Sequence, residues 1–192
     1  MRHHDQVDHQ LQDDTLVGDQ AELAAQMNKV VAIHPLRNAH PDWTYVCIEH
    51  LVLHRGTWYT PAPLPVGRDR GDERHCFANA TRHSRAHELI YVEGYALGPH
   101  GLIFEHAWCA RPDGTVEDPT WPDGAGLAYL GIPFDADYIA RFEQLRGVTT
   151  RMLFDPHLDN WQLLRTGLPT SFNDAPVHDD NHAQFATDYR GA

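Results

Sequence analysis

The chain has 192 residues, which is enough for one domain of ordinary size. With 42% hydrophobic and 22% charged residues it can form a packed core, which argues against a fully disordered chain. Fifteen Lys and Arg against 27 Asp and Glu give a formal net charge of −12. This balance argues against a nucleic acid or an anionic membrane surface as the main partner, because both attract clusters of basic residues.

The two ends of the chain are polar. Residues 1–14 predict a flexible N-terminal tail, and residues 171–192 predict a loose C-terminal tail, so we expect a single domain over residues 15–170. The sequence has no run of 18 apolar residues and no apolar segment of a secretory signal near its start. Three cysteines are too few for a disulfide framework. We therefore expect a cytoplasmic protein without a membrane span.

Helices are predicted first along the chain. Apolar residues recur at helical spacing within residues 19–30, which indicates a first helix. Pro41 and Asp42 favour the start of a second helix, and Gly56 is a natural end for it. A strand over residues 43–53 is the alternative, because that segment is rich in β-branched and aromatic residues.

Beyond residue 57, the sequence predicts a connection, one helix, three strands and a final helix. Residues 57–75 contain three Pro and two Gly and predict an irregular connection, after which a helix begins near Cys76. Three candidate strands follow at residues 89–96, 102–110 and 115–121. Residues 122–134 resemble a loop, and Asp135 is the expected N-cap of a helix over residues 135–144. Helices grouped ahead of an antiparallel sheet predict an α+β fold.

Three side chains have the chemistry of a cysteine nucleophile and its partners. Acyl transfer by a thiol requires an imidazole that moves the proton and a carboxylate that orients the imidazole. Cys76 lies at the expected start of a helix, where free N–H groups favour a thiolate. His106 lies within the second candidate strand, and Asp118 lies within the third.

The turn between these two strands decides whether His106 and Asp118 can meet. His106 and Trp108 share one face of their strand because side chains alternate. A three-residue loop over 112–114, with Gly114 in a bulge, would place Asp118 opposite Trp108 and diagonal to His106. A two-residue turn would send Asp118 to the other face. The mechanism therefore requires the longer loop.

Four short motifs occur in one order: CFANA from Cys76, YVEGY from Tyr91, HAW from His106 and DPT from Asp118. Together, over about residues 74–121, they resemble the core of the transglutaminase-like superfamily, which belongs to the papain-like cysteine enzymes. The resemblance implies N-terminal helices packed on an antiparallel sheet. It also implies that Cys76 is the nucleophile, that His106 is the general base and acid, and that Asp118 orients His106.

From the resemblance we expect a cysteine hydrolase that cleaves a peptide or isopeptide bond through a thioester, with a peptide or protein substrate and no cofactor. The side chains expected to contact the substrate are Trp108, Asn79 and Tyr95. A catalytically silent binding module of the same fold, a transamidase and a deamidase are alternatives.

A zinc site is a further alternative, with His106 and Cys109 as ligands. A second possible ligand set is His106, Cys76 and His87. The sequence contains no CxxC or HExxH spacing to support either set. His83 and His87 follow Cys76 on one helix face, and the helical rise puts His83 about 10 Å from it, so we expect both at the surface or behind the site. We expect Cys47 in the core and Cys109 on the sheet face opposite His106.

Overall fold

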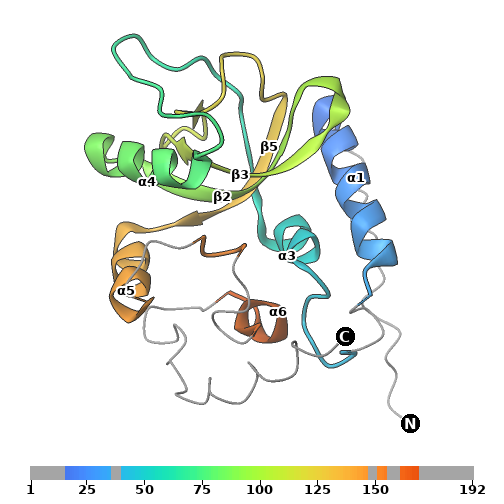
Figure 1. Ribbon diagram of the computed structural model, residues 1–192. Coiled ribbons are helices and arrows are strands. Elements are labelled where there is room, and N and C mark those ends of the chain that lie inside the picture. Colours follow the sequence, from blue (N-terminus) through green and yellow to red (C-terminus); the bar gives the residue numbers. More distant parts are fainter. Residues whose placement is uncertain (1–15, 36–39, 147–150, 155–160, 169–192) are drawn as a thin grey trace, which may run out of the picture.

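The computed structural model describes residues 16–35, 40–146, 151–154 and 161–168. This part of the chain is a mixed α/β fold that combines helices with a curled, antiparallel sheet of five strands (Figure 1). The expected tails, residues 1–14 and 171–192, lie outside the described residues. Within the described residues, no helix is long and apolar enough to cross a membrane.

The elements follow one another along the chain in the order shown in Figure 1. The helices are α1 (Asp19–Ile33), α3 (Ile48–Arg55), α4 (Cys76–His87), α5 (Ala136–Arg146) and α6 (Gln162–Thr166), with a 3-10 turn η1 (Pro99–Gly101). The strands are β1 (Thr57–Tyr59), β2 (Ile90–Leu97), β3 (Ile103–Ala110), β4 (Val116–Glu117) and β5 (Ala128–Phe134). In the sheet they are ordered β1-β5-β2-β3-β4, and each neighbouring pair is antiparallel.

The first two helices differ in how closely they follow the sequence pattern. Helix α1 confirms the helix expected over residues 19–30. Helix α3 also confirms a helix before Gly56, but it begins at Ile48 and not near Pro41. The N–H groups of Thr44 and Tyr45 are bonded to carbonyls of the segment around α6. Because this tertiary contact uses the backbone, the helix starts only after it, and the strand alternative was wrong.

Strand β5 is the largest error of the sequence-based prediction, because residues 122–134 were expected to be loop. The strand lies between β1 and β2, near the middle of the sheet. Its Gly131 is required by packing, since a Cβ there would come within 2.6 Å of the Trp108 ring. Its Pro133 lies beyond the end of β1, which pairs only with residues 129–131, and proline is tolerated where a strand lacks a neighbour.

Strand β1 was also missed, because residues 57–75 were expected to form an irregular connection, whereas the remaining strands and the helix α5 follow the pattern more closely. Strands β2 and β3 match two of the candidates, whereas the third is reduced to the two residues of β4. The chain turns directly after β4, where the Asp118 side chain binds backbone N–H groups. Asp135 is the N-cap predicted for α5, because its carboxylate accepts the Tyr138 N–H at 2.7 Å.

Apolar side chains fill both faces of the sheet. The larger cluster lies against α1, α3 and α4 and includes Leu23, Met27, Leu51, Val52, Ala80, Tyr95, Cys109 and Leu130. The smaller cluster on the other face includes Tyr59, Val92, Ala96, Trp108, Ala110, Val116 and Tyr129. The strand bearing His106 therefore lies between two packed layers, which fixes its position.

A buried carboxylate fastens a late segment of the chain to the main core. Glu93 of β2 accepts the N–H groups of Met152 and Leu153 at 2.9 and 2.7 Å, and the Tyr91 hydroxyl at 2.8 Å. Burial raises the pKa of Glu93 to about 7, although these donors oppose the shift. The bonds from Met152 and Leu153 hold residues 151–154 against β2, and the bond from Tyr91 fixes the carboxylate.

Candidate active site

The β3–β4 hairpin has the longer of the two loops considered. Arg111 donates its N–H to the Thr115 carbonyl at 2.9 Å, which closes a loop of three residues, and Gly114 has a φ of 81°. In the resulting register Cys109 faces Glu117 across the strands. Asp118, one residue further on, thus comes to the face of β3 that carries His106, and the predicted register is confirmed.

His106 and Asp118 are joined by a short hydrogen bond. The distance between His106 Nε2 and Asp118 Oδ2 is 2.7 Å, and both side chains are almost completely buried. The same Asp118 oxygen accepts the Tyr129 hydroxyl at 3.0 Å. The other oxygen accepts the N–H groups of Thr120 and Trp121 at 2.8 and 3.0 Å. With both oxygens bonded, the carboxylate has a fixed orientation and fixes the imidazole in turn.

Burial would raise the pKa of Asp118, but the hydrogen bond and the charge of His106 outweigh it and lower the pKa. The two backbone N–H groups that Asp118 accepts act in the same direction. Asp118 is therefore a carboxylate at neutral pH. It accepts a hydrogen bond from the Nε2–H of His106, so Nδ1 is the other ring nitrogen available for proton transfer.

Cys76 is the first residue of α4, as predicted from the sequence. It follows Arg74, which has a φ of 65°, and His75, which is the N-cap. Cys76 is 9% exposed and lies close enough to His106 to raise the pKa of that ring. Asp118 occupies Nε2, so Nδ1 is the ring nitrogen left for a second partner. The structure therefore brings together the three side chains predicted to act on one another.

The pKa of His106 reflects both neighbours. Burial alone would lower it, but the hydrogen bond to Asp118, the interaction with Cys76 and the charges of both raise it to about 9. His106 is then an imidazolium at neutral pH, balanced by Asp118 on one side. Its positive charge lies beside the Cys76 sulfur, at a helix N-terminus where free N–H groups also favour negative charge.

Aromatic rings cover the imidazole. Trp121 stacks on His106 with ring centroids 4.2 Å apart, and Trp108 and Tyr129 lie near it at 6.2 Å. These rings keep water away from the bond between His106 and Asp118, and a hydrogen bond is electrostatically stronger where water is excluded. Sequence reasoning missed Tyr129 because it lies in the segment expected to be loop.

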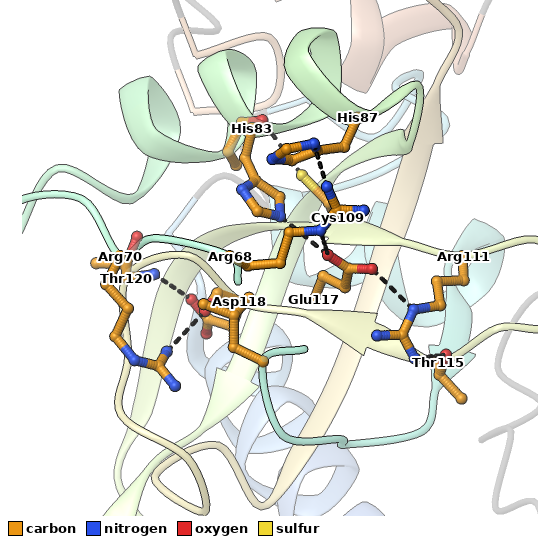
Figure 2. Close-up of polar contacts among 12 residues, drawn as sticks. Arg68, Arg70, His83, His87, Cys109, Arg111, Thr115, Glu117, Asp118 and Thr120 are labelled. Atoms are coloured by element: carbon orange, nitrogen blue, oxygen red, sulfur yellow. Dashed lines mark hydrogen bonds and ion pairs between the residues drawn. The ribbon is translucent and has the colours of Figure 1, made fainter. Parts of the chain in front are cut away.

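The connection that precedes Cys76, residues 61–75, crosses the turn that contains Asp118, and we name it the strap. Arg70 of the strap donates to the carbonyls of Asp118, at 2.9 Å, and of Trp121, and it pairs with Asp123. The Gly71 N–H is bonded to the Pro119 carbonyl at 2.7 Å. Figure 2 shows Arg70 beside Asp118 and Thr120. The strap thus links the backbone leading to Cys76 with the backbone holding Asp118. No sequence motif indicated this role for Arg70.

The three side chains expected to contact substrate are buried. Asn79 donates to the Asp72 carbonyl at 2.7 Å and to the Thr120 hydroxyl at 3.1 Å. Its oxygen accepts Arg82 at 2.9 Å. Since its amide is fully used in joining α4, the strap and the Asp118 turn, the expectation of a substrate contact is corrected to a structural role.

Trp108 and Tyr95 require the same correction. Trp108 is fully buried between the rings of Tyr59 and Tyr129, and within the described part of the chain its Nε1 has no hydrogen-bond partner. Tyr95 lies in the main core against Phe154, at 5.5 Å between ring centroids. Trp108 and His106 do lie on the same face of β3, as strand alternation predicted. The smaller apolar cluster, however, covers Trp108.

The remaining cysteines lie away from this site. Cys47 is buried as expected, and burial raises its pKa to about 12. Cys109 is also buried on the predicted face, where its thiol donates to the Ala80 carbonyl at 3.2 Å. In the described residues no three His, Cys, Asp or Glu side chains converge as metal ligands. The zinc sets proposed from the sequence are not assembled there.

A second carboxylate–histidine pair lies behind the hairpin (Figure 2). His83 is buried, and its Nε2 is 3.0 Å from Glu117 Oε2. Arg111 bonds to the other Glu117 oxygen at 2.8 Å, and Arg68 approaches at 3.5 Å and also contacts His87. His83 is thus in the interior, behind the site and apart from the thiol as the helical rise predicted.

Comparisons with models of known protein families, with curated proteins and with solved structures found no match to this chain. The function is therefore argued from the geometry of the site.

Proposed function

We propose that this chain is a cysteine hydrolase that cleaves an amide bond of a peptide or protein substrate through a thioester intermediate. One observation supports this most: His106 is hydrogen-bonded to Asp118, its pKa is raised by the neighbouring Cys76, and Cys76 begins a helix. A nucleophile, a base and a residue that orients the base are the parts this chemistry requires.

The reaction begins with the Cys76 sulfur as the nucleophile and His106 as the carrier of the proton. The sulfur attacks the carbonyl carbon, and the N–H groups of the first turn of α4, including that of Cys76, are suited to receive the negative oxygen. His106 gives its proton to the leaving nitrogen, the C–N bond breaks, and the acyl group stays on sulfur. Water then attacks the thioester and loses a proton to His106, the C–S bond breaks, and the acid leaves.

The charge arrangement suits both halves of this cycle. The raised pKa of His106, about 9, keeps the ring protonated at neutral pH until the leaving group needs the proton. Asp118 stays ionised and holds Nε2, so proton transfer takes place at Nδ1, on the side of the sulfur. The aromatic cover on the ring limits loss of this proton to solvent.

The wider assignment to a transglutaminase-like, papain-like fold is part of this proposal. It is supported by the order of the four motifs and by a cysteine helix that precedes antiparallel strands carrying the histidine and the aspartate. Hydrolysis is favoured over transfer to an amine because water needs no second binding site in the chain. Incorporation of a fluorescent amine into a protein acceptor would distinguish the two.

The proposal is tested by thiol labelling and by acyl-enzyme formation. At pH 6, iodoacetamide should alkylate Cys76 while Cys47 and Cys109, both buried, remain unmodified in the folded protein. Incubation with p-nitrophenyl acetate should give an acetyl adduct that maps to Cys76 by mass spectrometry. Cys76→Ala should lose both reactions, and Cys109→Ala should keep them. Equal labelling of the three cysteines, or no labelling of Cys76, would contradict the proposal and favour a silent binding module.

A further inference from the structure

An apolar surface borders the candidate active site. Among the described residues, three exposed apolar side chains lie at one end of the central strands: Leu102, Phe104 and Leu127. Their backbones are neighbours, because Leu102 accepts the Gly98 N–H at 2.7 Å and Leu127 donates to the Leu97 carbonyl at 2.8 Å. Phe104 shares the face of β3 that carries His106 and is 42% exposed.

Phe104 is fixed in place next to the aromatic cover of His106. Its ring meets the partly exposed ring of Trp121 edge-on, with centroids 5.5 Å apart. Gly98 makes room for both, since a Cβ there would come within 2.8 Å of Phe104 and 3.5 Å of Trp121. Trp121 in turn stacks on His106 at 4.2 Å. A continuous apolar surface therefore runs from the exposed Phe104 to the imidazole.

The proposed reaction determines which part of a substrate meets this surface. His106 must give its proton to the nitrogen of the leaving group, so that nitrogen approaches the imidazole. The substituent on the nitrogen then extends past the rings that flank His106, whereas the acyl part stays on the sulfur side. Burying apolar surface there favours an apolar substituent over a small or charged one.

We propose that Phe104 and Trp121 form a subsite for the apolar side chain of the residue that follows the scissile bond. This inference rests on the proposed function and adds the substrate class: a peptide with an aromatic or branched aliphatic residue on the leaving-group side. Leu102 and Leu127 extend the same apolar surface away from His106. The subsite acts in acylation, and by reversal it also receives an amine that attacks the thioester.

The reverse of acylation, attack of an amine on the thioester, provides the test. Acyl-enzyme formed from p-nitrophenyl acetate is offered water together with phenylalaninamide, leucinamide or glycinamide, whose amino groups have similar reactivity. The amine nitrogen attacks the thioester carbon, its proton passes to His106 and the C–S bond breaks, which yields an N-acetyl amino-acid amide. Liquid chromatography with mass spectrometry measures that product against acetate, so each reaction contains its own reference.

We expect the wild-type acyl-enzyme to prefer phenylalaninamide and leucinamide over glycinamide by about tenfold. Phe104→Ser should remove most of this preference. Ile90→Ser is the matched control, because Ile90 is also an exposed apolar strand residue, 40% exposed, and lies at the far end of β2 from Phe104; it should keep the preference.

The outcomes separate the subsite from the proposed function. If no acetyl adduct forms on Cys76, the hydrolase proposal fails and the subsite fails with it. If the adduct forms but the three amines compete equally in the wild type, the subsite is wrong while the hydrolase stands. If Ile90→Ser lowers the preference as much as Phe104→Ser, the effect is general and the subsite is again wrong.

Discussion

Two cysteine–histidine–carboxylate groups lie around the β3–β4 hairpin, one on each side. The first consists of Cys76, His106 and Asp118, and the second of Cys109, His83 and Glu117. The two carboxylates, Glu117 and Asp118, are consecutive in the chain. In each group, α4 and β3 together supply the cysteine and the histidine. The residue types are nearly the same, so the difference in their chemistry comes from their surroundings.

The carboxylates differ in what balances their charge. Glu117 accepts Arg111 and His83 and lies near Arg68, and although burial would raise its pKa, these contacts lower it. Asp118 accepts neutral donors besides His106, namely the Tyr129 hydroxyl and two backbone N–H groups. In the first group the histidine supplies the positive charge, whereas in the second group arginines supply it. Only the first arrangement requires a protonated ring.

The cysteines differ in position. Cys109 lies near the end of β3, fully buried, and burial raises its pKa well above the ordinary value. Cys76 lies at a helix start beside the His106 ring. A thiol becomes a nucleophile through a nearby cation and free N–H groups, so the helix start determines which group can react.

The largest difference between the two groups should appear when each carboxylate becomes an amide. Asp118→Asn should lower turnover about a thousandfold, because the ring loses the acceptor that holds Nε2. It should also lower the pKa of His106 from about 9, since burial remains and the contributions of Asp118 that oppose it are gone. Glu117→Gln should change turnover less than about threefold and reduce the free energy of unfolding by about 2 kcal/mol.

These two variants are compared by ester hydrolysis, by NMR titration of the His106 ring and by urea unfolding. Equal losses of turnover in Asp118→Asn and Glu117→Gln would mean that both carboxylates serve one structural network, and the distinction between the groups would be wrong.

The next largest effect concerns stability and pH. The pKa of His106 is about 9 in the folded protein and 6.5 for an ordinary histidine, so protonation stabilises the fold below pH 6.5. This contribution should be lost as the pH rises from 6.5 to 9, by about 3 kcal/mol for a shift of this size. Urea unfolding of the wild type and of His106→Gln at pH 6.5 and 9.5 measures it. The wild type should lose its advantage at the higher pH, and a difference independent of pH would refute the assignment.

The smallest expected effect tests whether the strap positions Asp118. Arg70→Lys removes a guanidinium that reaches two carbonyls and a carboxylate around Asp118, which one ammonium cannot replace. Turnover should fall about tenfold through kcat, with KM little changed, because Asp118 loses positioning and no substrate contact is removed. Arg85→Lys is the control, since Arg85 pairs with Glu143 on the surface of α4. A loss confined to KM would instead place Arg70 in substrate binding.

Much of the candidate site could be predicted because it depends on local patterns. The helix start at Cys76 follows from the break after a strap rich in Pro and Gly, and the facing of His106 and Asp118 follows from strand alternation and a loop ending in Gly114. Burial could not be predicted in the same way. Trp108, Asn79 and Tyr95 occur in the motifs beside the reacting residues, yet tertiary packing covers all three.

The sequence by itself determined the order of the elements around Cys76 and indicated the three side chains that converge, because helix starts and strand faces are set by neighbours in the chain. It left two registers open for the hairpin, and the structure chose the longer loop. The tertiary structure alone decided that β5, with Gly131 and Pro133, is a central strand, and that Tyr129 binds Asp118. It also decided that Arg70 donates a hydrogen bond to the Asp118 carbonyl. These features depend on contacts between segments far apart in the chain, whose closeness no local pattern records.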